Sequence, residues 1–116
     1  MKTKESFKAY SRIWISTDEG NYLGEGRITL LNEIHKHKSI SKAAQSMKMS
    51  YKKAWDMVNS MNTIGNAPLV IRTIGGTGGG GSEVTKEGKK AIALFNSVKA
   101  NNRAFLEQEM TKTDFS

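Results

Sequence analysis

SISKAAQSMKMSYKKAWDMVNSMN, residues 39–62, is the stretch of sequence that decides the fold. It is typical of two short helices joined by a tight turn, because small and apolar residues recur at helical spacing in each half. The inward positions are Ala43, Ala44, Met47, Ala54, Val58 and Met61. Between Glu33 and Asp56 the chain carries six lysines and no acidic residue. Such a helix pair, apolar inside and basic outside, is suited to a DNA groove, although an ordinary solvated helical hairpin has the same pattern.

Serine residues mark the predicted starts of both helices. We expect Ser39 or Ser41 to cap the first helix, which continues to about Lys48. A serine side chain in this position accepts a hydrogen bond from a free backbone N–H of the first turn. Ser50 is placed to cap the second helix in the same way, and that helix is predicted to run from Tyr51 to Ile64.

The second helix has one apolar and one polar face. On a helical wheel its inward residues are Tyr51, Ala54, Met57, Val58 and Met61, and its outward residues are Lys52, Asp56, Asn59 and Thr63. Lys53 and Trp55 fall on the two borders. Trp55 is then either a residue at the edge of the core or a ring that lies against a sugar or a thymine methyl group. Gly65 is expected to end the helix at the C′ position, where glycine is favoured.

The segments before the helix pair predict a β-hairpin and one more helix. We expect residues 1–9 to form a flexible leader. Tyr10 to Leu23 is predicted to be a hairpin, because strand-forming residues precede turn residues at positions 18–21. A helix is predicted from Glu25 to about His37. The core face of this helix is formed by Ile28, Leu30, Leu31 and Ile34.

Six of the seven residues from Gly75 to Gly81 are glycine. Leu69 to Ile74 predicts a strand before them, and Ser82 to Thr85 predicts a short returning strand. A dinucleotide-binding loop needs a helix directly after the glycines, and a phosphate-binding loop needs a lysine where a serine stands. We therefore expect the tip of a β-hairpin whose backbone N–H groups can meet phosphates, with a loop of no function as the alternative. Arg72 is either a phosphate clamp beside this tip or a surface charge.

A long helix is predicted from about Lys86 towards Met110, with Thr85 as its cap. Ala91, Phe95, Val98, Asn102 and Phe105 recur along it at spacings of four, three, four and three. This heptad pattern is typical of a helix that pairs with a second copy, and a polar asparagine in such a seam fixes the register. A helix that packs on its own domain has the same pattern, with the asparagine solvated.

Charge and composition limit the classes of function. At 116 residues the chain is long enough for one domain. Its net charge of +7 is concentrated in residues 34–82, where seven basic residues face a single acid, Asp56. A patch of this kind is expected for a partner that is a polyanion. The chain has no apolar run long enough to span a membrane and no signal peptide, so a bacterial-type cytosolic protein is expected.

Catalytic and metal chemistry have little support in the sequence. Without cysteine there is no disulfide, no thiolate zinc site and no cysteine nucleophile. His35 and His37 point in different directions on their predicted helix, and neither a third ligand nor an acidic partner is apparent in the sequence. We expect no catalytic residue, no metal and no cofactor, and hence no enzyme.

The order of the predicted elements is that of a winged helix–turn–helix. The predicted fold class is α+β, mainly α, with an N-terminal β-hairpin, a β-hairpin wing and a long C-terminal dimerisation helix. Residues 10–84 would form the DNA-binding domain, and residues 85–116 the dimerisation helix and tail of the same single domain. The second helix of the pair would lie in the major groove while the wing reaches over the backbone.

Several motifs resemble the DNA-binding domain of the bacterial molybdate-responsive regulator family ModE. They are the run from Ser39 to Ser50, the block YKKAWD at 51–56, Met61-Asn62, Pro68-Leu69-Val70, the glycine segment 75–81, and Thr85-Lys86-Glu87-Gly88. The resemblance covers about residues 24–106, and a more distant one relates the chain to the LysR-type helix–turn–helix. Family members sense molybdate through appended C-terminal domains. Because this sequence stops at Ser116, we expect a stand-alone form without that sensor, and molybdate sensing stays open.

The resemblance implies which residues would contact DNA. The recognition surface would be lined by Ser50, Tyr51, Lys52, Lys53, Trp55 and Asp56, while Arg72 and Thr77 would touch the DNA backbone. We also assign contacts to Ser39, Ser41 and Lys42, and the wing to Gly75, Gly76, Gly78, Gly79, Gly80 and Gly81. Asp56 would accept a hydrogen bond from a cytosine amino group or orient a lysine.

The predicted function is that of a sequence-specific, DNA-binding transcriptional regulator that acts as a homodimer. The resemblance implies a dimer built through the last helix, and we assign its contacts to Phe95, Val98, Asn102 and Phe105. The predicted partners are double-stranded DNA and a second copy of the chain, with a separate sensor protein left open. The alternative is a protein-interaction module that uses the last helix and carries an incidental basic patch.

Overall fold

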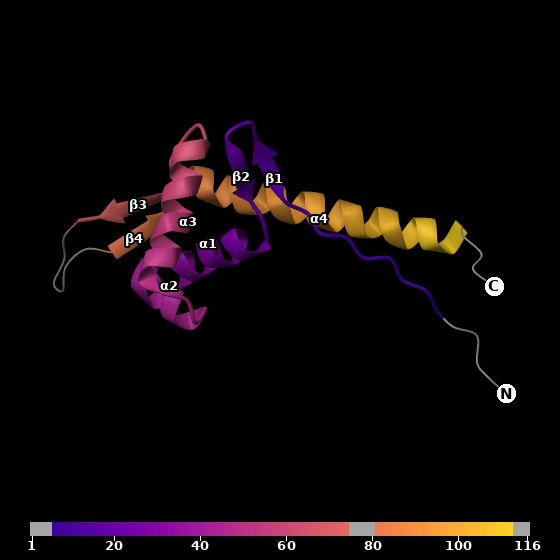
Figure 1. Ribbon diagram of the computed structural model, residues 1–116, viewed down its shortest axis with the longest axis horizontal. Helices are drawn as coiled ribbons and strands as arrows, with labels where there is room; N and C mark the ends of the chain where they lie inside the picture. The colour runs from indigo at the N-terminus through magenta and orange to yellow at the C-terminus, as the bar shows by residue number, and fades with distance from the viewer. Residues whose placement is uncertain (1–5, 75–80, 113–116) are drawn as a thin grey trace.

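Four helices and four short strands make up the described part of the chain. The computed structural model describes residues 6–74 and 81–112. In chain order the elements are β1 (Ile15–Thr17), β2 (Gly20–Leu23), α1 (Glu25–His37), α2 (Ile40–Ser46), α3 (Tyr51–Ile64), β3 (Val70–Thr73), β4 (Gly81–Val84) and α4 (Lys86–Lys112). This order confirms the predicted α+β, mainly helical class, and the arrangement is compatible with a winged-helix-like fold (Figure 1).

The core forms around α1. Leu30, Leu31 and Ile34 have no exposed surface, as the helical periodicity predicted. α2 and α3 turn small residues toward this helix, and Ala43 and Ala54 are likewise fully buried. Small side chains at these positions let the three helices approach one another closely. The opposite face of α3 therefore remains in solvent.

The predicted serine caps are present in the structure. The side-chain oxygen of Ser39 accepts a hydrogen bond from the backbone N of Lys42 at 3.1 Å. The side-chain oxygen of Ser50 accepts one from the backbone N of Lys53 at 3.0 Å. Ser39, and not Ser41, is therefore the cap of α2. Each bond satisfies one of the free N–H groups of a first helical turn, which fixes where α2 and α3 begin.

Two helix ends differ from the prediction. α2 ends at Ser46, earlier than expected, and Lys48 turns the chain with a left-handed backbone (φ 55°). Gly65 ends α3 as predicted but is extended (φ −75°, ψ 169°) rather than left-handed. A Cβ atom at Gly65 would lie 2.6 Å from the hydroxyl oxygen of Tyr22. Any other residue at this position would therefore displace the tyrosine ring of β2, whereas the backbone angles do not call for glycine.

β3 and β4 form the antiparallel hairpin that was predicted as the wing. The paired residues are Val70 with Val84, Ile71 with Glu83, Arg72 with Ser82 and Thr73 with Gly81. The backbone N of Ser82 donates to the carbonyl oxygen of Lys38 at 3.0 Å, so β4 is also joined to the end of α1. Most of the predicted glycine tip, residues 75–80, lies outside the described residues.

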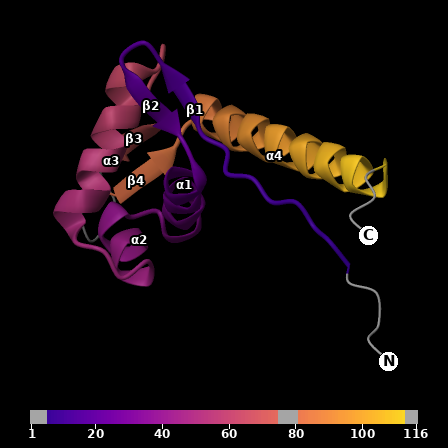
Figure 2. The same ribbon diagram turned by 45° about the vertical axis from the view of Figure 1, so that its right-hand side comes forward.

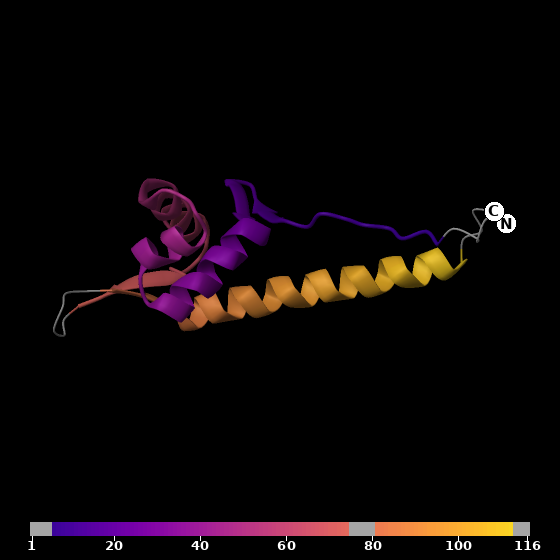
Figure 3. The same ribbon diagram turned by 90° about the horizontal axis from the view of Figure 1, so that it is seen from below.

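Residues 6–14 form an extended arm (Figure 1), so residues 10–14 are not the first part of the hairpin as predicted. β1 and β2 pair only between residues 15 and 23, with an irregular register between Ile15 and Ser16. The arm runs beside α4 in the opposite direction (Figures 1 and 3). The hydroxyl of Ser11 donates a hydrogen bond to the side-chain oxygen of Asn102 in α4. Of the predicted flexible leader, residues 1–5 lie outside the described residues.

α4 has a buried first part and a projecting second part. Gly88, Ala91 and Phe95 are buried against the core, whereas the residues from Asn96 onward are exposed or half-buried. The projecting part elongates the molecule to 66 × 34 × 21 Å (Figures 1 and 2). Within residues 6–74 and 81–112, no helix combines the length and apolarity that crossing a membrane demands.

Candidate nucleic-acid interface

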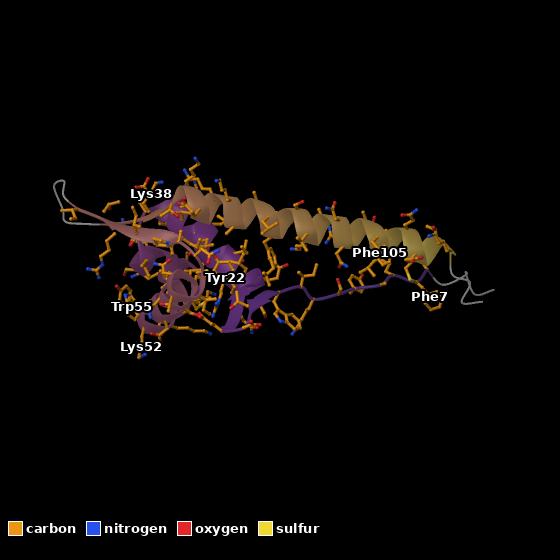
Figure 4. The ribbon with its side chains drawn as sticks, turned by 90° about the horizontal axis from the view of Figure 1, so that it is seen from above. Phe7, Tyr22, Lys38, Lys52, Trp55 and Phe105 are labelled. Atoms are coloured by element: carbon orange, nitrogen blue, oxygen red, sulfur yellow. The ribbon has the colours of Figure 1, made fainter. Side chains whose placement is uncertain are left out.

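α3 presents an exposed surface that includes the predicted contact residues. The side chain of Lys52 is 83% exposed and extends from the helix into solvent (Figure 4). Tyr51 is 48% exposed and Trp55 is 43% exposed. The inward position that the wheel gave Tyr51 was therefore wrong, because Tyr51 lines a hollow beside β3 instead of packing in the core. Trp55 lies at the edge of the domain, with almost half of its surface in solvent.

Asp56 pairs with Lys52, one helical turn earlier. The ammonium nitrogen of Lys52 lies 2.9 Å from a carboxylate oxygen of Asp56. Both side chains are more than half exposed, so this pair stabilises the fold by only about 0.3–0.5 kcal/mol. Of the two roles considered for Asp56, orienting a lysine corresponds to a contact in the structure. A hydrogen bond to a base stays a prediction.

A hollow of about 480 Å³ lies where the starts of α2 and α3 meet the wing. We call it the wing-side hollow. It is lined by Ser39, Ile40, Ser41, Tyr51, Arg72, Thr73, Ile74, Gly81 and Ser82. Predicted contact residues from α2, α3 and β3, far apart in the sequence, are therefore brought together here. Arg72 supplies positive charge, and the hydroxyl groups of Ser41 and Tyr51 are donors of the kind that bind phosphate oxygens.

A second hollow, of about 330 Å³, is bordered by α3 and the first turn of α1. We call it the α1-side hollow. It is lined by Arg27, Ser50, Lys52, Lys53, Asp56 and Met57. All of these except Arg27 and Met57 were predicted contact residues. Arg27 was missed because the first 33 residues carry balanced charge, and no local signal shows that the start of α1 lies beside α3.

Asn62 attaches the wing to α3. Its side-chain nitrogen donates to the carbonyl oxygen of Val70 at 2.9 Å. Its side-chain oxygen accepts from the backbone N of Leu69 at 2.8 Å and of Val70 at 3.3 Å. Since β3 is the first strand of the wing, these bonds set the direction in which the wing leaves α3. From its sequence context Asn62 was expected only as part of the Met61-Asn62 motif, with no role assigned.

Two predicted contact residues of the described part of the chain, Lys42 and Trp55, line neither hollow. Lys42 is exposed on α2. Thr77 and the predicted wing glycines Gly75, Gly76, Gly78, Gly79 and Gly80 lie outside the described residues. Gly81 is the first residue of β4, where its backbone N donates to the hydroxyl of Thr73 at 3.1 Å. The role of the wing tip therefore stays a prediction.

His37 has an acidic partner that the sequence analysis overlooked. Its Nε2 atom lies 3.2 Å from a carboxylate oxygen of Glu33, one turn earlier on α1. In the described part of the chain, no three histidine, aspartate or glutamate side chains gather in a way that would hold a metal ion. The pair is a contact within α1, away from the two hollows.

The predicted heptad seam of α4 is buried at its start and exposed farther along the helix. Phe95 is fully buried in the core of its own domain. Asn102 is half-buried and bonded to Ser11 of the arm. Phe95 is therefore not available as a surface residue, which corrects its assignment to a dimer contact.

An exposed apolar stripe remains on α4, and Phe105 lies on the side that faces the arm (Figure 4). Val98 is 39% exposed and Phe105 is 56% exposed. Leu94, which the sequence analysis did not select, is 55% exposed and lies on the same side of the helix. We call Leu94, Val98 and Phe105 the α4 stripe. The stripe shares Val98 and Phe105 with the predicted seam, but it begins at Leu94 where the seam has Phe95.

Comparison with known proteins places the chain beside bacterial molybdenum-related regulators. It is 36% identical over 98 residues to the molybdenum transport protein ModE of Azotobacter vinelandii, a match that covers 84% of this chain and 36% of that protein. It is 46% identical over 70 residues to the transcriptional regulator ModE of Yersinia pestis, covering 60% of this chain and 27% of the relative. These proteins are its homologues.

A third ModE homologue is named as a DNA-binding protein. The DNA-binding transcriptional dual regulator ModE of Escherichia coli K12 is 44% identical over 70 residues, or 60% of this chain and 27% of that protein. The predicted relation to ModE proteins is thus confirmed as homology, and none of the three is named as an enzyme. The chain spans about a third of the length of the ModE proteins it matches, 36% at most among these three. No protein-family model matches the chain.

Proposed function

We propose that this chain is a sequence-specific, DNA-binding transcriptional regulator of the ModE type that acts as a homodimer. The observation that carries the proposal is the wing-side hollow, where α2, α3 and β3 bring predicted contact residues together beside the exposed surface of α3. The names of the ModE homologues, two of which are transcriptional regulators, support the same role.

α3 is the element proposed to enter the major groove. In helix–turn–helix proteins the N-terminal residues of the recognition helix contact base edges. Lys52 and Lys53 stand at this end of α3 and are exposed. Asp56 holds Lys52 in place or accepts a hydrogen bond from a cytosine amino group. Trp55 lies against a sugar or a thymine methyl group, which is consistent with its 43% exposure.

The wing-side hollow is proposed to hold the DNA backbone. Arg72 binds a phosphate there, with the hydroxyl groups of Ser39 and Ser41 as further donors. Lys42, exposed on α2, and Thr77 of the wing are proposed as outer backbone contacts. Such contacts fix the position of the protein on the duplex, whereas α3 selects the sequence.

A second copy of the chain is proposed to pack against the α4 stripe. Leu94, Val98 and Phe105 are large apolar side chains with substantial exposed surface in one protomer. Fully burying such a side chain stabilises an interface by about 1.5–3 kcal/mol. Asn102 and the arm would border this interface. Two copies would then read half-sites about one helical turn apart, as symmetric dimers do.

Selection of bound sequences from random duplex DNA tests the proposal. We expect a palindromic motif, and in anisotropy titrations the selected duplex should bind roughly 10³-fold or more tightly than a scrambled one. Replacing Lys52 or Lys53 by alanine should weaken binding by about 1–3 kcal/mol where the side chain reads a base. Lys89→Ala, an exposed lysine on α4, is the matched control.

The alternative, a protein-interaction module with an incidental basic patch, predicts a different result. Such a protein would dimerise but bind the selected and scrambled duplexes alike. That result, or the absence of saturable binding to any duplex at low salt, would refute the proposed function. We also propose that the regulator acts on bacterial chromosomal DNA in the cytoplasm.

A further inference from the structure

We propose that Arg27 is a second phosphate-binding residue, which holds the DNA backbone on the side of α3 opposite to the wing. The inference rests on the proposed function and adds to it a contact that the sequence analysis did not find. Three observations support it. Arg27 lines the α1-side hollow, hydrogen bonds hold its side chain in place, and this hollow lies across α3 from the wing-side hollow.

Arg27 is held in one orientation by the backbone of the N-terminal hairpin. Its Nη1 atom donates to the carbonyl oxygens of Asn21 at 2.6 Å and of Tyr22 at 3.0 Å. A guanidinium group has five N–H donors, so the N–H groups on Nη2 and Nε remain for another acceptor. Because the side chain is already ordered, binding an anion costs little additional conformational entropy.

Arg27 has no acidic partner within 4.0 Å in residues 6–74 and 81–112. Its neighbours in the α1-side hollow include two more cations, Lys52 and Lys53, and one acid, Asp56. That acid is already paired with Lys52. The hollow therefore has an excess of positive charge and suits an anion.

The two hollows flank α3 on opposite sides. Residues advance by about 100° each around a helix, so Lys53 and Trp55 point about 160° apart. Lys53 lines the α1-side hollow together with Met57. Tyr51, on the same side of the helix as Trp55, lines the wing-side hollow. The first turn of α1 lies close to α3 here, since a Cβ atom at Gly26 would be 3.9 Å from the terminal methyl of Met57.

This arrangement matches the geometry of a helix in the major groove. The groove is about 12 Å wide, close to the diameter of an α-helix with its side chains, and a phosphate backbone runs along each of its walls. Arg72 of the wing is proposed to bind the phosphate backbone along one wall. Arg27 is the arginine on the other side, where Ser50 and Lys53 line the same hollow. The ligand is thus a phosphodiester group of the duplex.

The salt dependence of DNA binding tests the role of Arg27. Each neutralised phosphate contributes about 0.9 to the slope of log K against log salt concentration. Arg27→Gln should lower the magnitude of this slope by about 0.9. If the variant and the wild type bind DNA equally at 1 M salt, the variant then binds about 8-fold more weakly at 0.1 M salt. The loss should be equal for selected and scrambled duplexes, since phosphate contacts do not read sequence. Arg27→Lys, which keeps the charge, should restore most of the slope.

Arg12→Gln is the matched control, because Arg12 is exposed on the arm and its replacement removes the same charge. It should leave the slope unchanged. The inference is overturned if Arg27→Gln keeps the wild-type slope. It is also overturned if the variant loses the same fold of affinity at every salt concentration and has a lower Tm, because Arg27 then only fixes the hairpin. If the wild-type protein itself shows no saturable binding, the proposed function fails and the inference with it.

Discussion

Replacing Asn62 by alanine should loosen the wing from α3 and destabilise the fold. The side chain of Asn62 donates one hydrogen bond to the carbonyl oxygen of Val70 and accepts two from the backbone N atoms of Leu69 and Val70. Alanine removes these partners. Leu69 is 2% exposed and Val70 is 4% exposed, so water is poorly placed to replace the lost bonds.

The expected loss follows from the number of groups that lose a partner. A buried donor or acceptor left unsatisfied costs about 1–3 kcal/mol. We count two groups, the N–H of Leu69 and the carbonyl of Val70, because the bond at 3.3 Å shares the acceptor atom of the shorter one. Asn62 is only half-buried, which favours the lower half of the range, about 2–4 kcal/mol in total. The better helix propensity of alanine offsets about 0.5 kcal/mol of this.

A net loss of about 1.5–3.5 kcal/mol should lower the Tm by about 6–14 °C for a domain of this size. Thermal and urea unfolding followed by circular dichroism measure it. Asn59→Ala is the matched control, since Asn59 is exposed one turn earlier on the same helix. The reasoning is refuted if the two variants differ in stability by less than about 0.5 kcal/mol, the range of ordinary surface substitutions.

Three further substitutions test other contacts. Gly88→Ala should lower the Tm even though alanine favours helices by about 1 kcal/mol, because a Cβ atom there would lie 2.6 Å from a methyl carbon of Val84 and would also meet a backbone carbonyl. Val98→Asp should give a monomer in sedimentation equilibrium with an unchanged circular dichroism spectrum, and a dimer as strong as the wild type would exclude the α4 stripe as the interface. Burial raises the pKa of Tyr22 above its ordinary value of 10.0, so its neutral form stabilises the fold fully below about pH 10 and less as the pH rises through the folded pKa. Tyr22→Phe should therefore reduce the loss of stability measured by urea unfolding between about pH 8 and about pH 11.

Two of the helices could be predicted together with their bounds. The bounds expected for the helices at 25–37 and 51–64 are those of α1 and α3. The signals for α3 are local, because the side chain of Ser50 bonds to a backbone N three residues later and Gly65 stops the helix at its other end. Both partners of such an interaction lie within a few residues of each other, so a short stretch of sequence is enough to predict it.

Features that depend on how distant elements meet could not be predicted. Phe95 and Leu94 point about 100° apart, and each fits a heptad with Val98. Which of them is buried depends on how α4 packs on the core, and the structure buries Phe95. Tyr51 was misplaced for a similar reason, since its turn of α3 borders the wing. Arg27 became a candidate only because the start of α1 lies beside α3.

Under the proposed function, the two hollows and the exposed face of α3 contribute differently to recognition. Arg72 and Arg27 would bind phosphates, which adds affinity and fixes position but carries no sequence information. Choice of operator must then come from the few side chains between them. Lys52 has three N–H donors, and Asp56 occupies one of them, so the remaining donors approach the groove from a fixed direction. The Lys52–Asp56 pair contributes little to stability, and its value to the protein would lie in orienting this lysine toward a base.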